Sequence, residues 1–515
     1  MAAFCNALIA APFAYREGRL APALSVLSLL VVFFCDTLAA QPRPADLVIF
    51  NAAVHTMTPR DSVQQAIAVK GNRITATGTN KLVKTFIGPS TVVMDAGGRL
   101  VLPGFNDAHV HFMGIGNGFS SIDLRDVKSA AEMTERIARY VKFLPKGRWI
   151  LGGHFDNKGW DLPDRKSLDA IAPDNPLFLY RAGAAAAIAN SLAFNIAKVK
   201  DSDAELDVSP TGEPTGIVRG RPLRQISLVV PANQTTNWLE IAETATNYAA
   251  SLGVTSVQDM QSDDSRAVYR QMERQGKLKT RVYDCLPLSD WSKLKTSRLP
   301  NHPGAMVTDG CLKGFSDGDD DEKTGLLRNV IAADQARLQV MVHAIGPAAN
   351  HIVLDVFERA IKTNGPRDRR LRIEHAHNSA GLDLPRFSRS HIIASMQPFL
   401  FEGREGSRYG TLLRQGALVA FGSDALIVDL NPLLGISAAV NHGSESVSVY
   451  EAVRAYTLGS AYAQFQEKEK GTIEPGKLAD FVILSDDIFA IGRSAIRDAR
   501  VVTTVVNGKI VYRSN

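Results

Sequence analysis

At 515 residues, the chain is longer than one typical core requires, and it has room for an α/β barrel with an accessory domain. Hydrophobic residues make up 45% of it and charged residues 22%, which is ordinary for a soluble globular enzyme. The formal net charge of +5 is spread thinly, without a long run of Lys or Arg. We therefore expect no nucleic-acid partner.

Residues 1–40 have the pattern of a secretory signal peptide. Arg16 and Arg19 precede an apolar run from Leu20 to Cys35, and small residues follow at 37–40. This order is typical of an export signal, and the apolar run is shorter than a membrane-spanning helix needs. We expect a periplasmic or secreted protein; an uncleaved N-terminal anchor and a misassigned start codon are the alternatives.

The region after the leader contains two cysteines, Cys285 and Cys311, which are too few for a disulfide framework. Cys285 lies inside a predicted strand and Cys311 directly before another. We therefore expect two buried free thiols.

Both ends of the remaining chain are rich in short predicted strands. The first end has strands at 46–50, 66–69 and 91–94, and the last has strands at 479–484, 501–506 and 509–512, with an Asn-Gly hairpin turn before the final one. This pattern predicts one small β-sandwich domain assembled from both termini, formed by residues 41–103 and 470–515.

The middle of the chain alternates strands with helical stretches, which predicts a parallel sheet with crossover helices. Eight candidate strands fit an α/β fold of the closed (β/α)8 TIM-like type over residues 104–469. The predicted strands are 105–111, 254–260, 281–286, 312–317, 340–343, 371–375, 392–397 and 418–424. A long insert after the first strand, at about 113–250, contains further candidate strands near 148–154 and 176–181. Such an insert emerges at the catalytic face of a barrel, so we expect a capping subdomain.

Polar residues gather at the predicted strand ends, where this fold places its chemistry. The motif Asp-Ala-His-Val-His ends the first strand, and alternation along a strand points His109 and His111 the same way. The other candidates follow on later strands: Lys313, His343, His375 and Asp424. Each has an ordinary structural explanation when taken singly, but nitrogen and carboxylate donors at successive strand ends suit a divalent ion such as Zn²⁺, with Mn²⁺ or Fe²⁺ as alternatives.

The sequence resembles the amidohydrolase superfamily and, more narrowly, amidohydrolase family 3, which includes N-substituted formamide deformylases and exoenzyme regulatory proteins. The resemblance covers roughly residues 45–515. Its motifs are Pro-Gly-Phe-Asn-Asp-Ala-His-Val-His at 103–111, His-Ala-Ile-Gly at 343–346, Arg-Ile-Glu-His at 372–375, Ser-Met-Gln-Pro at 395–398, Gly-Ser-Asp at 422–424 and the segment 471–480.

The resemblance implies a role for each candidate. His109 and His111 would hold one metal with Asp424, while a carboxylated Lys313 would bridge to a second metal held by His343 and His375. One or two Zn²⁺ ions are expected. Asp424 would act as the proton acceptor and His375 would help to polarise the carbonyl of a small-molecule substrate. The resemblance is also compatible with a homo-oligomer.

Three departures from the family pattern affect the surroundings of the site. A histidine usual before the Asn190-Ser191 pair is replaced by alanine in the run 184–187, and an acidic and a basic residue after Gly346 are replaced by Pro347 and Ala348. The third departure is an extra histidine, His377, for which we favour a supporting role over metal ligation. Weaker candidates for substrate contact are His154, Asp317 and His377. For the rest of the acidic run 317–322 a solvated loop is the default expectation, with binding of a cation or an amine-bearing substrate as the alternative.

The expected activity is hydrolysis of an amide-type C–N bond in a small N-acyl or N-formyl compound. Two alternatives remain open. The same site could act on esters or lactones or deaminate its substrate, or the chain could be a binding or regulatory protein on this scaffold.

Overall fold

The computed structural model describes residues 43–514 except 60–61, 119–121, 126, 183–184, 203–205, 232–237, 261–264, 298–301 and 426. The predicted signal peptide lies outside the described residues. Among the helices that are described, none is both long enough and apolar enough to cross a lipid bilayer.

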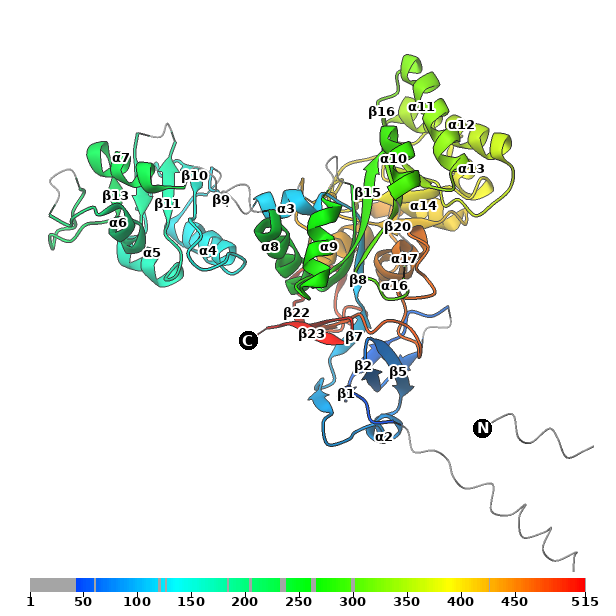
Figure 1. Ribbon diagram of the computed structural model, residues 1–515, viewed down its shortest axis with the longest axis horizontal. Helices are drawn as coiled ribbons and strands as arrows, with labels where there is room; N and C mark the ends of the chain where they lie inside the picture. The colour runs from blue at the N-terminus through cyan, green and yellow to red at the C-terminus, as the bar shows by residue number, and fades with distance from the viewer. Residues whose placement is uncertain are drawn as a thin grey trace, which may run out of the picture. The chain divides into compact units, whose positions relative to one another are not determined.

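Eight parallel strands form the central sheet, in the order β20-β19-β18-β17-β16-β15-β14-β8 (Figure 1). A parallel bridge between Val110 and Ala425 joins the two ends of this order and closes the barrel. All eight predicted strands are confirmed, with shifts of a few residues at their ends. Their bounds are Phe105–Val110 (β8), Val254–Asp259 (β14), Arg281–Pro287 (β15), Val307–Ser316 (β16), Gln339–Ile345 (β17), Arg372–His377 (β18), Ile393–Met396 (β19) and Val419–Phe421 (β20).

The helices that follow these strands contribute apolar side chains to the large core around the barrel. The longest, α11 (Asp320–Gln335) and α12 (Pro347–Asn364), follow β16 and β17 and pack on each other. The others are α8 (Trp238–Ser251), α9 (Arg266–Arg274), α10 (Trp291–Ser297), α13 (Leu384–Arg389), α14 (Tyr409–Arg414), α15 (Pro432–Val440), α16 (Val449–Arg454) and α17 (Ser460–Ala463).

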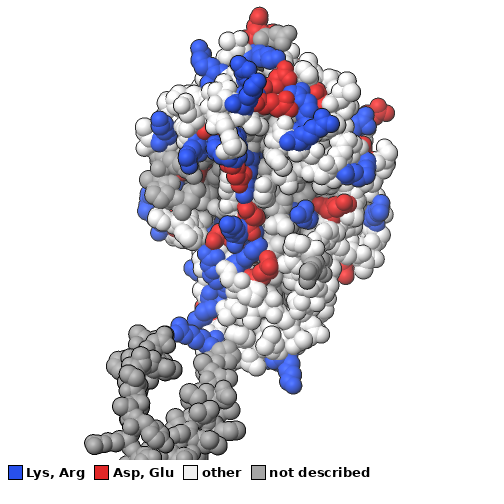
Figure 2. Space-filling model, turned by 90° about the vertical axis from the view of Figure 1, so that its right-hand side faces the viewer, with Lys and Arg blue, Asp and Glu red and all other residues white. Residues whose placement is uncertain are grey.

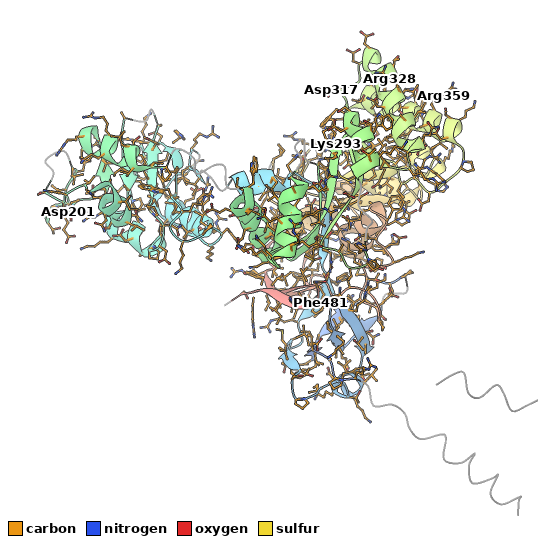
Figure 3. The ribbon with its side chains drawn as sticks, viewed as in Figure 1. Asp201, Lys293, Asp317, Arg328, Arg359 and Phe481 are labelled. Carbon is orange, nitrogen blue, oxygen red and sulfur yellow. A yellow bond between two sulfur atoms is a disulfide. The ribbon has the colours of Figure 1, made fainter. Side chains whose placement is uncertain are left out.

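The two ends of the chain form two facing sheets, as the fold class predicted. One sheet has the order β5-β4-β1-β6 and the other β23-β22-β21-β7-β2-β3. Strand β7 pairs with β21, so segments almost four hundred residues apart lie side by side (Figure 1). Phe481, labelled in Figure 3, belongs to the apolar core of this part. The bounds are Leu47–Phe50 (β1), Ala53–His55 (β2), Val63–Gln64 (β3), Ala66–Lys70 (β4), Arg73–Gly78 (β5), Asn80–Lys84 (α2), Val92–Asp95 (β6), Leu100–Pro103 (β7), Phe481–Leu484 (β21), Val501–Val506 (β22) and Lys509–Arg513 (β23).

The insert after β8 begins with α3 (Phe112–Gly118) and contains its own five-stranded sheet, in the order β13-β12-β11-β10-β9. Two separate apolar clusters fill the insert, so it has a core of its own. Its function as a cap stays a prediction. Its elements are Ile122–Asp123 (β9), Ala130–Val141 (α4), Gly152–Phe155 (β10), Arg165–Ile171 (α5), Phe178–Arg181 (β11), Ala187–Ala189 (β12), Ser191–Ala197 (α6), Ile217–Val218 (β13) and Gly220–Val229 (α7).

The expectation of free thiols is wrong, because Cys285 and Cys311 form a disulfide. The two residues lie opposite each other on the adjacent strands β15 and β16, with their Cα atoms 4.6 Å apart, which is within the range that a disulfide can span. Both are fully buried. The disulfide therefore links two barrel strands from inside.

On the face shown in Figure 2, acidic and basic side chains are interspersed. In the acidic run 317–322, Asp319 is the N-cap of α11 and accepts a hydrogen bond from the backbone N–H of Asp321. Carboxylates at this end of a helix are favoured by the helix dipole. Helix capping thus accounts for the position of Asp319.

Candidate metal centre

Three side chains from the two strands that close the barrel offer ligand atoms to one point. His109 lies at the end of β8, His111 follows that strand, and Asp424 follows β20. Their ligand atoms lie within 4.8 Å of one another, with Asp424 Oδ1 at 3.5 Å from His109 Nε2 and 3.4 Å from His111 Nε2. Asp424 Oδ1 is buried and accepts no hydrogen bond from any residue that the structure describes. Two imidazoles and an unsatisfied carboxylate oxygen are a donor set that fits a divalent ion.

The imidazole of His109 is oriented by Glu374, which the sequence analysis did not select. Glu374 Oε2 lies 2.6 Å from His109 Nδ1, and both side chains are almost fully buried. A carboxylate can only accept hydrogen bonds, so Nδ1 of His109 carries the proton. The lone pair of its Nε2 then faces Asp424. Carboxylate–histidine pairs of this kind fix ligand tautomers in metal sites.

Arg372 in turn holds Glu374 in place from the interior of the barrel. Its Nε donates to Glu374 Oε1 at 2.8 Å, and both side chains are fully buried. The guanidinium also donates to the Ala108 carbonyl at 2.6 Å, to Ser395 Oγ at 3.1 Å and to Gln258 Oε1. It therefore bridges strands β8, β14, β18 and β19. The Arg-Ile-Glu-His motif thus supplies a supporting pair as well as a candidate ligand.

Lys313 points from β16 toward the same group, with its Nζ 3.5 Å from His109 Nε2. Burial lowers the pKa of Lys313 to about 8, although the carboxylates of Glu374 and Asp424 act in the opposite direction. A lysine with such a pKa is partly neutral near pH 8. The neutral amine is the form of Lys313 that can react with CO₂.

His343 and His375 complete the cluster from β17 and β18. Their ring centroids lie 4.5 Å apart, and the His375 ring lies 4.8 Å from that of His109. His375 Nδ1 donates to Gln397 Oε1 at 2.8 Å, which leaves Nε2 as the acceptor nitrogen. The structure therefore brings all six predicted metal-site residues together; their assignment as ligands stays a prediction.

Asp107 is a second residue that the sequence analysis missed. It is fully buried and accepts hydrogen bonds from the backbone N–H groups of His109 at 3.0 Å and Ser423 at 3.0 Å. Burial raises the pKa of Asp107 to about 7, against the effect of these hydrogen bonds. Because the two donors belong to the first and last segments of the barrel, Asp107 holds His109 and Asp424 in register.

Backbone geometry also marks the centre. His375 has φ 72° and Asp424 has φ 61°, in the left-handed region that residues other than glycine seldom adopt. Such conformations gather at functional sites, where the surrounding structure holds them in place.

Burial acts to raise the pKa of Asp424, but the neighbouring His111 and His109 outweigh it and lower the pKa below its usual value. Asp424 is therefore held as a carboxylate.

The weaker candidates lie outside this cluster. The ring of His377 stacks on Phe401 with centroids 3.9 Å apart, and its Nδ1 lies 3.2 Å from Ser407 Oγ. Asp317, labelled in Figure 3, is exposed directly after β16, at the end of the strand that carries Lys313. His154 is exposed on β10 in the insert, with its ring 6.3 Å from that of Tyr180.

Two departures from the family pattern have different outcomes. Ala184, in the run that replaces a family histidine, lies outside the described residues. Pro347 is the first residue of α12, after Gly346 with φ 96°, and proline is favoured there because its missing N–H and fixed φ suit a helix start. Pro347 therefore has a structural explanation.

A closed (β/α)8 barrel whose strand ends gather histidine and carboxylate donors is typical of metal-dependent hydrolases. The sequence model of the amidohydrolase family matches residues 92–512 of this chain. The chain therefore belongs to the amidohydrolase family, whose members are divalent-metal-dependent hydrolases that act on carbon–nitrogen bonds, and the resemblance seen in the motifs is confirmed.

Individual relatives span almost the whole chain. Protein LONG AFTER FAR-RED 3 of Arabidopsis thaliana is 32% identical over 95% of this chain and 96% of its own length. N-substituted formamide deformylase of Arthrobacter pascens is 27% identical over 91% and 98%. Among solved structures, an uncharacterised metal-dependent hydrolase of Pyrococcus horikoshii OT3 is 26% identical and superposes with a TM-score of 0.60, covering 87% of this chain and 99% of the other.

Proposed function

We propose that this protein is a metal-dependent amidohydrolase that hydrolyses the C–N bond of a small N-acyl or N-formyl compound. The observation that carries the proposal is the convergence of His109 Nε2, His111 Nε2 and Asp424 Oδ1 at the mouth of the barrel. A relative similar over nearly its whole length is an N-substituted formamide deformylase, which supports the amide as substrate.

The residues present fit one or two Zn²⁺ ions. His109, His111 and Asp424 would hold the first ion. Lys313 would join it to a second ion as a carbamate, formed when the neutral Nζ attacks CO₂ and releases a proton. His343 and His375 would hold that second ion.

The chemistry divides between the ion and the protein. A divalent ion supplies Lewis acidity, which acidifies water toward a pKa of about 7 and polarises a carbonyl. The carboxylate of Asp424 accepts a proton from the attacking water and passes it to the leaving nitrogen. His375, whose Nδ1 donates to Gln397, presents Nε2 as an acceptor nitrogen, so it fits a metal ligand and would act on the carbonyl only through the ion that it holds.

The proposal extends to export of the protein to an oxidising compartment. The leader-like residues 1–40 and the Cys285–Cys311 disulfide support it independently, because disulfides persist outside the reducing cytosol. Mass analysis of protein from the periplasm or medium should find a chain that begins near residue 41 and has no free thiol. A full-length reduced protein confined to the cytosol would refute this part.

The activity is tested on purified protein with metal removed and then restored. We expect a substrate panel of N-formyl amines, N-acyl amino acids, esters, lactones and aminopurines to show turnover of amides that chelation abolishes and Zn²⁺ restores. His109→Ala should lose both metal and activity, whereas His302→Ala, a substitution at an exposed histidine, should keep both. Preferred turnover of esters, lactones or aminopurines would overturn the amide assignment, and full activity in His109→Ala would overturn the site.

A further inference from the structure

Strand β16 presents an exposed aromatic ring immediately beyond the metal centre. Side chains two residues apart share one face of a strand, so Cys311, Lys313 and Phe315 form a row from the barrel interior to its mouth. The first is fully buried, Lys313 is 4% exposed and Phe315 is 62% exposed. The Phe315 ring lies 5.1 Å from Lys313 Nζ. The strand ends one residue later, just before Asp317 (Figure 3). Phe315 therefore lies at the rim of the candidate centre.

The neighbouring strand β17 repeats the arrangement. Met341 is fully buried, His343 is half-buried and Ile345 is 41% exposed, again in steps of two residues. Phe315 is paired with His343 across the two strands, with ring centroids 5.7 Å apart. Two adjacent strands thus carry a buried residue, a candidate metal-site residue and then an exposed apolar residue.

Exposed apolar side chains next to convergent polar groups are typical of sites that bind small molecules, since burial of the apolar surface by a ligand is favourable. The geometry points to an apolar subsite formed by Phe315 and Ile345, here called the apolar rim, that binds an alkyl or aryl substituent flanking the scissile amide. This inference rests on the proposed function and narrows its substrates to amides with an apolar side group.

The first test measures turnover with a series of N-alkylformamides of increasing chain length. In the wild type, kcat/KM should rise about twofold with each added methylene. This rise corresponds to half of the free energy gained by full burial of a methylene, because one side of the substituent stays in water. Phe315→Ala and Ile345→Ala should flatten this rise, so that their loss of kcat/KM relative to the wild type grows with chain length. Ile510→Ala is a matched control, since Ile510 on β23 is 38% exposed in the terminal sandwich. A parallel series with longer acyl groups shows which side of the amide lies on the rim.

The second test measures binding without turnover. Calorimetric titration of the metal-stripped wild type with the same N-alkylformamides should give affinities that rise with chain length, and Phe315→Leu should keep the rise that Phe315→Ala loses. An unaltered chain-length dependence in both alanine variants, in turnover and in binding, would overturn the inference while amide hydrolysis stands. Chain-length-dependent binding by the rim together with no hydrolysis of any amide would refute the proposed function instead.

Discussion

Replacement of Glu374 by glutamine should show what the negative charge of this side chain contributes, because glutamine has nearly the same size and shape without the charge. The variant keeps the size of the side chain but leaves the guanidinium of Arg372, which is fully buried, without its carboxylate at 2.8 Å. An uncompensated buried charge costs about 3–5 kcal/mol. His109 would also lose the carboxylate at 2.6 Å that fixes its tautomer, and loss of such a partner typically weakens metal binding by about 10- to 100-fold.

Two measurements separate these effects. Urea unfolding of the metal-free protein reports the free energy of unfolding, and titration with Zn²⁺ against a competing chelator reports metal affinity. Glu374→Gln should lower both. The double variant Arg372→Met/Glu374→Gln should recover the part of the stability that the unpaired charge costs, but not the part that the hydrogen bonds of Arg372 to Ala108, Ser395 and Gln258 contribute, while metal affinity stays weak.

A matched control is Glu467→Gln, which removes the carboxylate of another glutamate–arginine pair, 2.7 Å from Arg370. This variant should leave metal affinity unchanged. The reasoning would be refuted if Glu374→Gln unfolded at the wild-type urea concentration and bound Zn²⁺ with wild-type affinity.

Three further outcomes are expected. Asp424→Asn should lower kcat by about 10²- to 10⁴-fold because the proton acceptor is lost, so near-normal steady-state kinetics would count against its role. Removal of the disulfide by Cys285→Ala with Cys311→Ala, across a separation of 26 residues, should lower the free energy of unfolding by about 3.5 kcal/mol; an unchanged urea midpoint would be inconsistent with this. Burial lowers the pKa of Lys470 from 10.5 to about 7 in the folded protein. Between these two pH values the unfolded chain binds more protons than the folded one, so the contribution of Lys470 to the free energy of unfolding rises from about pH 7 to about pH 10.5. Lys470→Met should lose this rise in denaturation at pH 7, 8 and 9, and an identical pH dependence in both proteins would disprove it.

The sequence predicted the barrel well because each strand is a local signal. Alternation of strands and helices gave all eight strands, and the motifs at their ends selected the six residues that the structure brings together. His109 and His111 could be assigned to one side from the period of a strand alone. These inferences required only that consecutive strands of a barrel are neighbours in space.

The residues that support the centre were missed because their roles depend on contacts across the closed barrel. Glu374 contacts His109 across 265 positions of the sequence, and Asp107 accepts from Ser423 across 316. One signal was available. Glu374 and Arg372 are two residues apart on β18 and therefore share one face of the strand. An acidic and a basic side chain buried side by side require partners.

The disulfide was missed because the two cysteines were considered one strand at a time. Cys285 and Cys311 lie on consecutive barrel strands, which are neighbours in space, but the register that places them opposite each other depends on an irregularity between Asp284 and Cys285. Adjacent strands with one cysteine each were a sufficient reason to consider a bond. The register itself could not be derived from spacing.

The pairing of β7 with β21 has a consequence for synthesis. The ribosome makes β7 about 380 residues before its antiparallel partner, and an unpaired strand edge is prone to join another chain. A nascent chain that has already produced the whole barrel still exposes this edge until residue 484 emerges. Truncation before β21 should therefore yield aggregates, even though every strand of the barrel is present.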